Sequence, residues 1–389
     1  MSVEFLPEEL IAQVLSYLPV KSLMQLRCVC KAWNSLLSHP KFIKLHFRQS
    51  KQNIQIICES FDFSFLPFPL NTLLNNPSTI KSTKNCFPFP SPADYFYQFI
   101  GSCNGLFCFL LKMNNLGKCI QNTWFQLWNP ATNTLSNKFG HQSYPLVNQH
   151  PILRCSAFSF GYHNSTDTYK CVYFRPNKLE IFTFGGSLWK IIQLPHIVPL
   201  EHSGRVPSTR SDLSEALYLN DTINLLARDI AKQILIISLN LGTDTYCRLL
   251  PPQDFVEVSI HLPTIHVLED SLCFSHHTQN THFIIWKMTQ FGIENSWTQF
   301  LKINYLDLDI HIDYKYFLAP LCLFENGIAL VQASNNHRLQ VILYHWGEKR
   351  IEKTRMQELT MWMFNQNHVE SLAPTDSRSQ PNFKHIRSY

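Results

Sequence analysis

Charged side chains are scarce in this chain. Only 16% of its 389 residues are Asp, Glu, Lys or Arg, which is low for a soluble protein built mainly of helices. No run of about 18 apolar residues occurs, so we expect no segment that crosses a membrane. The chain does not start with a basic stretch followed by an apolar one, so we predict no secretory signal peptide. These absences favour a protein of the cytoplasm or nucleus, in which the 12 cysteines stay free thiols.

The sequence motifs of catalysis are missing as well. There is no Gly-x-Ser-x-Gly nucleophile turn, no His-Glu-x-x-His metal site and no phosphate-binding loop. Gly185 and Gly186 are typical of a turn between strands and not of a phosphate cradle, because no helix pattern follows them. We therefore expect a protein that is not an enzyme and that needs no cofactor and no metal.

Two groups of possible metal ligands have simpler interpretations. Cys28 and Cys30 lack the Cys-x-x-Cys spacing and lie within a helical pattern, which favours packing over metal binding. His276, His277 and His282 have no Cys or carboxylate at zinc-like spacing. We expect these histidines in a solvated loop beside a turn.

An acidic stretch near residue 310 leaves two interpretations open. Its polar members alternate with apolar residues, so on a strand they would line one face: Asp307, Asp309, His311 and Asp313. Such a face could hold a cation or a basic peptide. It is more typical of an exposed outer strand.

The net charge of +5 is concentrated at the N-terminus. Residues 1–52 contain seven Lys or Arg against three Glu, which leaves the rest of the chain nearly neutral. Nucleic-acid binding usually requires a denser basic surface. A modestly acidic protein partner fits this charge at least as well, and we predict neither nucleic acid nor a membrane as a partner.

Residues 7–48 have the apolar spacing of short helices. The first helix is expected from Pro7, with an apolar stripe made of Leu10, Ile11, Val14, Leu15 and Leu18. A capping-box pattern at Ser22 predicts the second helix, and a third carries Trp33 before Pro40 stops it. Three short helices bury little apolar surface, so this module needs something else to pack against.

From about residue 50 the apolar period changes to two, and hairpin units repeat. One unit has a two-residue polar turn between apolar runs, at residues 103–107, 219–223, 268–272 and 324–328. A second unit with a longer turn follows each of these, at residues 125–130, 235–246, 283–297 and 339–351. A fifth pair lies at residues 158–169 and 179–189. Two hairpins about every 50 residues predict the four-stranded blades of a kelch-like β-propeller.

Closing such a ring needs one more blade. We expect it to combine residues 54–100 with a C-terminal strand near Val369, giving about six blades. Residues 62–98 are rich in Pro and Phe and have no clear strand pattern. The predicted fold is α+β and multidomain, with a small three-helix module followed by an all-β domain that is a kelch-like propeller. A β-sandwich or an irregular β domain is the alternative.

The helical segment resembles an F-box of the plant type. The resemblance is carried by both Leu-Pro steps, Leu6-Pro7 and Leu18-Pro19, and by the ending Val29-Cys30-Lys31-Ala32-Trp33. It implies a three-helix module that docks on the Skp-type adaptor of a cullin–RING ubiquitin ligase. Carried over position by position, the implied adaptor contacts are Leu6, Pro7, Leu10, Leu18, Pro19, Leu23, Leu26, Val29, Cys30 and Lys31. Trp33 is expected in the core of the module itself.

The β region is similar to the F-box-associated domain of plant F-box proteins. Matching stretches lie at residues 101–106, 128–132, 160–170, 292–298, 325–327 and 369–372. The departure from the family pattern lies at residues 204–217, and residues 222–226 lack the tryptophan of the family's Leu-x-Trp-Leu step. The predicted organisation is an F-box at 1–48, a linker or irregular first blade at 49–98, a propeller-like domain at 99–375 and a disordered tail at 376–389.

This resemblance implies a substrate-recognition subunit of a Skp–cullin–F-box ligase, acting in ubiquitin-dependent protein degradation. The F-box would dock on the adaptor, which brings the cullin and RING subunits, and the β domain would bind an unidentified target protein, which could be a glycoprotein. Two alternatives stay open. One is a Skp-binding interaction protein that works without a cullin, and the other is a glycan- or ligand-binding propeller. For residues 7–48, a helical hairpin packed on its own β domain is the simpler structural alternative.

Overall fold

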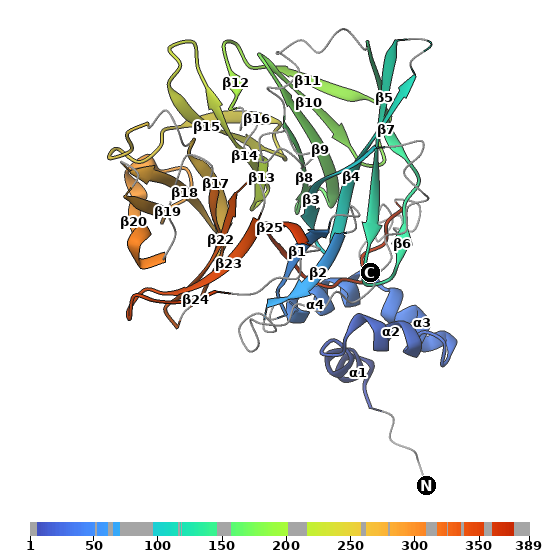
Figure 1. The fold of residues 1–389 in the computed structure, drawn as a ribbon. Helices are drawn as coiled ribbons and strands as arrows, with labels where there is room; N and C mark the ends of the chain where they lie inside the picture. Colours follow the sequence, from blue (N-terminus) through green and yellow to red (C-terminus); the bar gives the residue numbers. More distant parts are fainter. Residues whose placement is uncertain are drawn as a thin grey trace.

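The structure is a computed structural model, and its ribbon is drawn in Figure 1. It describes residues 6–50, 53–60, 65–70, 96–115, 117, 119–145, 157–200, 216–257, 262–278, 281–308, 317–324, 326–335, 338–353 and 360–376.

Four helices precede the first strand. They are α1 (Glu8–Leu15), α2 (Val20–Leu26), α3 (Lys31–Ser38) and α4 (Pro40–Ser50). The prediction of three helices was wrong, because Pro40 begins α4 and does not stop the pattern. Proline suits the first turn of a helix, where its missing N–H would have no acceptor. In the same way α2 begins at Val20, directly after Pro19, and not at the capping-box pattern of Ser22.

The described strands form six antiparallel sheets. The first sheet contains β3 (Phe96–Cys103), β4 (Leu106–Asn115), β5 (Ile120–Asn129), β6 (Thr134–Leu135) and β7 (Phe139–Pro145). The second contains β8 (Ala157–His163), β9 (Thr168–Arg175), β10 (Lys178–Thr183) and β11 (Trp189–Gln193). The third contains β12 (Val198–Pro199), β13 (Ala216–Leu219), β14 (Thr222–Arg228), β15 (Ile234–Asn240) and β16 (Thr245–Leu249).

The other three sheets complete the set. The fourth contains β17 (Thr264–Leu268), β18 (Ser271–Thr278), β19 (His282–Met288) and β20 (Trp297–Asn304), and the short 3-10 helices η3 (Glu294–Ser296) and η4 (Tyr305–Leu308) flank β20. The fifth contains β21 (Phe317–Phe324), β22 (Ile328–Asn335), β23 (Arg338–His345) and β24 (Arg350–Lys353). The sixth contains β1 (Gln55–Ser60), β2 (Phe65–Pro69) and β25 (Thr360–His368).

The six sheets are arranged as the blades of a propeller. The innermost strands of the blades lie next to one another in the order β3, β8, β13, β17, β21 and β25, and β25 lies next to β3 again. The last blade joins the two ends of the β domain, because β25 pairs with β1, Gln55 opposite His368. This arrangement confirms the predicted kelch-like propeller, including the blade that combines an early segment with a C-terminal strand. Two blades exceed the predicted four strands, since β7 adds to β5 and β12 adds to β14.

The predicted hairpin turns define the blades. Asn104 and Gly105, which join β3 to β4, have φ values of 51° and 78°. Positive φ at both central residues is the requirement of the tight turn that matches strand twist, and Asn-Gly satisfies it at low cost. The second strand of a blade is covered on both faces by its neighbours, so β9 and β14 are buried nearly throughout and β4 is buried from residue 106 to 111.

A buried ion pair connects the second and third blades. The Lys170 ammonium, 7% exposed, donates to the Leu241 carbonyl at 2.5 Å and to Asp244 Oδ1 at 2.6 Å. Lys190 reaches the other Asp244 oxygen at 2.8 Å from the surface. Burial would raise the pKa of Asp244, but hydrogen bonds from Lys170 and Lys190 lower it below its usual value. The Lys170 ammonium and the Asp244 carboxylate each offset the cost of burying the other, so the pair stabilises the contact between the two blades.

Replacing Lys170 with methionine tests this connection. We expect the free energy of unfolding to fall by about 3 kcal/mol, because the substitution leaves a carbonyl and part of a carboxylate buried without a donor. The control is Lys190→Met, which removes an exposed partner and should cost less than about 1 kcal/mol. Urea denaturation of both variants measures the difference. Equal losses in the free energy of unfolding would contradict the larger contribution of Lys170.

His368, the last residue of β25, makes stability depend on pH. Its ring lies edge-on to Phe107 with centroids 4.6 Å apart, and Nδ1 lies 3.3 Å from Ser102 Oγ. Burial lowers the pKa of His368 from 6.5 to about 3. Between these values the unfolded chain binds a proton at this residue and the folded chain does not. The stability is therefore complete above pH 6.5 and is lost as the pH falls toward 3.

The effect of His368 can be isolated by substitution. At pH 5.5 the wild-type chain should be about 1.4 kcal/mol less stable than at pH 7.5 on account of this residue alone. His368→Leu should show a pH dependence that is smaller by that amount. Some dependence should remain, since burial also lowers the pKa values of His46 and His276. Urea denaturation at the two pH values measures the free energy of unfolding. The same change with pH in both chains would show that His368 does not titrate as described.

Candidate docking face of the helical module

The four helices share one small apolar core. Its buried members come from every helix and from the end of the β domain: Leu15, Val20, Leu23, Leu37, Phe42 and Leu372. Leu23 is fully buried there, so the structure places this predicted adaptor contact inside the module. Leu18 and Leu26 are half-buried against the same core. Trp33 is also only half-buried, and the fully buried residue of α3 is Leu37.

The outer side of the module presents a different set of apolar side chains. Leu6, Leu10, Val14, Tyr17 and Val29 are exposed by 66%, 47%, 68%, 65% and 66%. We call these five residues the docking face. Leu10 and Val14 share one face of α1 because they are four residues apart. In Figure 1, α1 lies at the end of the molecule away from the sheets, so the β domain does not cover this face.

Most of the predicted contacts lie on or beside the docking face. Those that are exposed, in addition to the members named above, are Pro7, Pro19, Cys30 and Lys31. Val14 and Tyr17 were missed by the prediction. A signal for them exists in the sequence, since Leu10, Val14 and Tyr17 follow the helical spacing i, i+4, i+7. Val14 was assigned instead to a single apolar stripe with core residues.

Hydrogen bonds within the module stabilise the corner between α2 and α3. The Arg27 guanidinium donates to Ser38 Oγ at 2.6 Å and to the Leu37 carbonyl at 3.5 Å, and burial lowers its pKa. Cys30 caps α3, because its sulfur accepts the Trp33 N–H at 3.5 Å. These bonds hold the corner that carries Val29. Cys28 and Cys30 are both exposed, so Cys28 does not pack in a core as predicted.

A buried histidine attaches α4 to the turn between α1 and α2. His46 Nε2 lies 3.0 Å from the Leu18 carbonyl, which can only accept, so Nε2 carries the proton. Burial is the main influence on His46 and lowers its pKa, so the ring is neutral at pH 7. This contact fixes the backbone of Leu18 and Pro19 directly beside the docking face.

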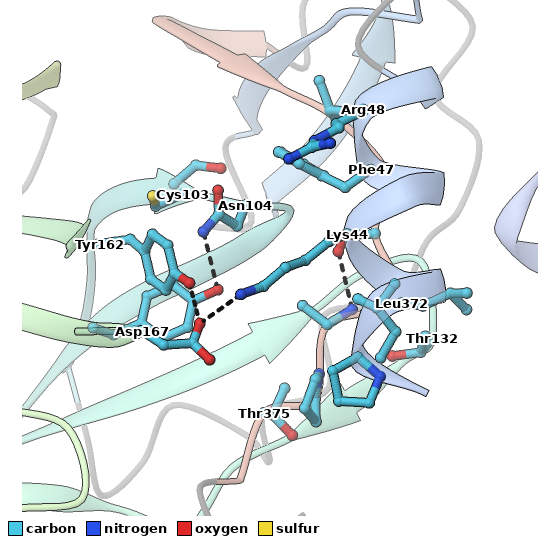
Figure 2. Close-up of a pocket in the computed structure, with 18 of the residues that line it drawn as sticks. Lys44, Phe47, Arg48, Cys103, Asn104, Thr132, Tyr162, Asp167, Leu372 and Thr375 are labelled. Atoms are coloured by element: carbon cyan, nitrogen blue, oxygen red, sulfur yellow. Dashed lines mark hydrogen bonds and ion pairs between the residues drawn. The ribbon is translucent and has the colours of Figure 1, made fainter. Parts of the chain in front are cut away.

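A cavity of about 1260 Å³ separates α4 from the turns of the neighbouring blades. Figure 2 shows Lys44 reaching from α4 toward Asp167 and Tyr162. Lys44 Nζ lies 3.3 Å from Asp167 Oδ1, and the Tyr162 hydroxyl donates to the same oxygen. Burial, with the nearby Asp167, raises the pKa of Tyr162. Lys44, Asp167 and Tyr162 interact with one another here, so this side of the cavity is a junction between the two parts of the chain.

The histidine prediction requires correction. His276 and His277 are buried inside β18 and do not lie in a solvated loop. The reason is that β18 is the second strand of its blade and is covered on both faces. His276 Nε2 accepts the Trp286 N–H at 3.2 Å, and burial lowers the pKa of His276. His282 begins β19, on the other side of the turn.

The acidic stretch is also not a strand where it is described. Asp307 lies in η4, whose start is held by the Asn304 side chain accepting the Leu306 N–H at 2.9 Å. Asp309, His311 and Asp313 lie outside the described residues. Gly185 and Gly186 lie between β10 and β11, as predicted for a turn. Within the described part of the chain, no three His, Cys, Asp or Glu side chains gather as a metal site would require.

Comparison with known proteins agrees with the geometry of the module. Residues 3–48 match the F-box-like family, and this range contains all four helices except the last residues of α4. The chain carries an F-box-like domain at its N-terminus. Two relatives from Arabidopsis thaliana extend the similarity across the β domain. The F-box/kelch-repeat protein At3g23880 is 26% identical over 85% of this chain and 88% of its own length, and the F-box protein At3g07870 is 26% identical over 85% and 83%.

The F-box protein therefore belongs with plant proteins that carry a C-terminal domain after the F-box. A solved structure of the uncharacterized protein lmo1340 from Listeria monocytogenes aligns with 67% of this chain and 82% of its own, with a TM-score of 0.35 at 8% identity, which is too distant to inform the function. None of the helices in the described part of this F-box protein has the length and apolar character needed to span a bilayer.

Proposed function

We propose that this F-box protein is the substrate-recognition subunit of a Skp–cullin–F-box ubiquitin ligase. The observation that carries the proposal is the docking face, five large apolar side chains that are exposed on a small helical module. Surfaces of this kind on soluble proteins usually mark a site where another protein binds. The match of residues 3–48 to the F-box-like family supports a Skp-type adaptor as that protein.

The charge of the module fits the same partner. Lys21, Lys31 and Lys41 are exposed on the module, which carries most of the net positive charge of the chain. Complementary charge speeds the encounter of two proteins and orients them, so an adaptor with an acidic surface would be favoured. Glu8 and Glu9, exposed in the first turn of α1, are the acidic residues among those described in the module.

The β domain would supply recognition and no catalysis. Residues 1–48 form the docking module, residues 99–375 form the recognition domain, and strands from residues 49–98 complete its ring. The domain holds a target protein, which could be a glycoprotein, beside a ubiquitin-charged enzyme that the cullin and RING subunits bring. Transfer is then accelerated by high effective concentration alone. Such a complex would act in the cytoplasm, the nucleus or both.

Reconstitution from purified parts tests the proposal. The full chain is mixed with a plant Skp-type adaptor and a cullin–RING pair and analysed by size-exclusion chromatography. We expect one complex that contains all four proteins, and none with a chain that carries Leu10→Asp. A complex with the adaptor that excludes the cullin would support an interaction protein that works without a ligase. No complex with the adaptor would support a glycan- or ligand-binding propeller and would overturn the proposal.

A further inference from the structure

The segment that follows the last strand has no regular structure and is nevertheless buried. Residues 369–376 leave β25 and run beneath the first blade, where Val369, Ser371, Leu372, Ala373 and Thr375 are all at most 8% exposed. Buried backbone outside helices and strands must find hydrogen-bond partners elsewhere. The partners of this segment therefore show what holds it.

One side of the segment is fixed to the first blade. Asn129, at the end of β5, donates from Nδ2 to the carbonyls of Ser371 and Ala373, both at 2.9 Å. A Cβ added at Gly105 would lie 2.3 Å from Ser371 Cβ and 2.7 Å from the Val369 carbonyl oxygen, so the segment lies directly on the turn between β3 and β4. The blade thus holds the backbone of the segment through buried contacts.

The other side of the segment enters the helical module. Leu372 is 3% exposed and packs in the module core with Leu15, Leu23 and Phe42, and Ala131 of the first blade packs against the same core. Figure 2 shows Leu372 beside α4 at the edge of the cavity. One side chain from the end of the β domain therefore completes the core of the F-box.

A polar contact across the same junction is weaker. Lys44 and Asp167 form an ion pair whose side chains are 58% and 36% exposed. Exposed ion pairs contribute little to stability. Leu372, with Ala131 beside it, thus supplies an apolar contact between the helical module and the β domain, and residues 369–376 hold Leu372 in place.

We propose that residues 369–376 form a clasp that fixes the F-box on the propeller, and that Leu372 is a positioning residue for ubiquitin transfer. This inference rests on the proposed function, because a fixed orientation matters when transfer depends on proximity. The clasp sets the distance between the docking face and the target held by the propeller. Without it the two parts stay joined by the chain but lose their defined orientation.

The distance between the two parts tests the clasp directly. Fluorescent non-natural amino acids replace Lys21 on α2 and Lys302 on β20, which are both exposed, and energy transfer is measured in single molecules of the full chain. We expect one narrow distance distribution for the wild-type chain. Leu372→Asp, and a chain that ends at Glu370, should both lose it and give a broad distribution. Leu372→Met, which conserves volume and apolarity, and a chain that ends at Asp376 should keep the narrow distribution.

Two further readouts separate positioning from folding. In the variant that ends at Glu370 the β domain should still unfold cooperatively and the adaptor should still bind, both less strongly because Asn129 and the module core lose buried partners. A broad distribution in a chain that still folds and binds reports orientation. In a reconstituted ligase, self-modification of the β domain should spread to more lysines in Leu372→Asp than in the wild-type chain. Narrow distributions in both disrupted chains would overturn the clasp. If no chain binds the adaptor, the proposed function fails, while the distance measurement still decides on the clasp.

Discussion

Replacing both Leu10 and Val29 with aspartate should abolish binding to a Skp-type adaptor. The two side chains are 47% and 66% exposed in the free protein, so the substitutions bury no new charge within the chain. At an interface they would each place a carboxylate in a desolvated apolar contact. Loss of a central apolar contact costs about 2 kcal/mol or more, so the pair should weaken binding roughly a thousandfold. Titration calorimetry with the purified adaptor measures this change.

The matched control for this test is Leu188→Asp. Leu188 is 83% exposed on the propeller, beside the second blade and outside the helical module. Its substitution adds a carboxylate at an exposed leucine away from the module and should leave the affinity unchanged. Leu18 would be a poorer probe, since it packs against the module core and its carbonyl bonds to His46. Equal binding by the double variant and the wild-type chain would exclude the docking face as the adaptor site.

Removal of the closing strand should unfold the β domain as a whole. A chain that ends at Lys353 lacks β25, which pairs with β1 from Gln55 to Ser60 and lies between β21 and β3 in the ring. Without β25, β1 loses one of its two partner strands. β21 and β3 lose the strand that lies between them. This loss exceeds the roughly 10 kcal/mol that separates a typical folded domain from its unfolded chain. We expect no cooperative transition in thermal unfolding followed by circular dichroism.

The control for this experiment is the chain that ends at Asp376. It keeps β25 and the clasp and should unfold cooperatively at the wild-type temperature. Separate blade-by-blade transitions in the chain ending at Lys353 would mean that the blades are stable on their own. A single unchanged transition in that chain would contradict the closure of the ring by β25.

Local sequence patterns predicted the blades because each blade is a local structure. Turns such as Asn104-Gly105 and the alternation of the flanking strands identify a hairpin without reference to the rest of the chain. The additional strands could not be found in this way. β12 has two residues, Val198 and Pro199, and its place beside β14 depends on the whole blade. The burial of His276 and His277 was missed for the same reason, since it depends on how the whole blade packs around β18.

The candidate site was predicted as a region and less well as a set of side chains. The Leu-Pro steps and the Val-Cys-Lys ending locate the module, but apolar spacing alone does not say which side of a short helix faces the core. Leu23 was assigned to the partner and lies inside, whereas Val14 was placed in the apolar stripe but not among the adaptor contacts and is 68% exposed. The difference arises from α4 and Leu372, which complete the core and turn α1 outward. Neither was predicted to be part of it.

Hydrogen–deuterium exchange of the full chain, with and without the purified adaptor, tests the central claim most directly. If the docking face receives the adaptor, amides of residues 6–19 and 27–33 should exchange more slowly in the complex, while the strands of the propeller should be unaffected. Protection confined to the blades, or no protection at α1 and the corner between α2 and α3 despite saturating adaptor, would contradict it.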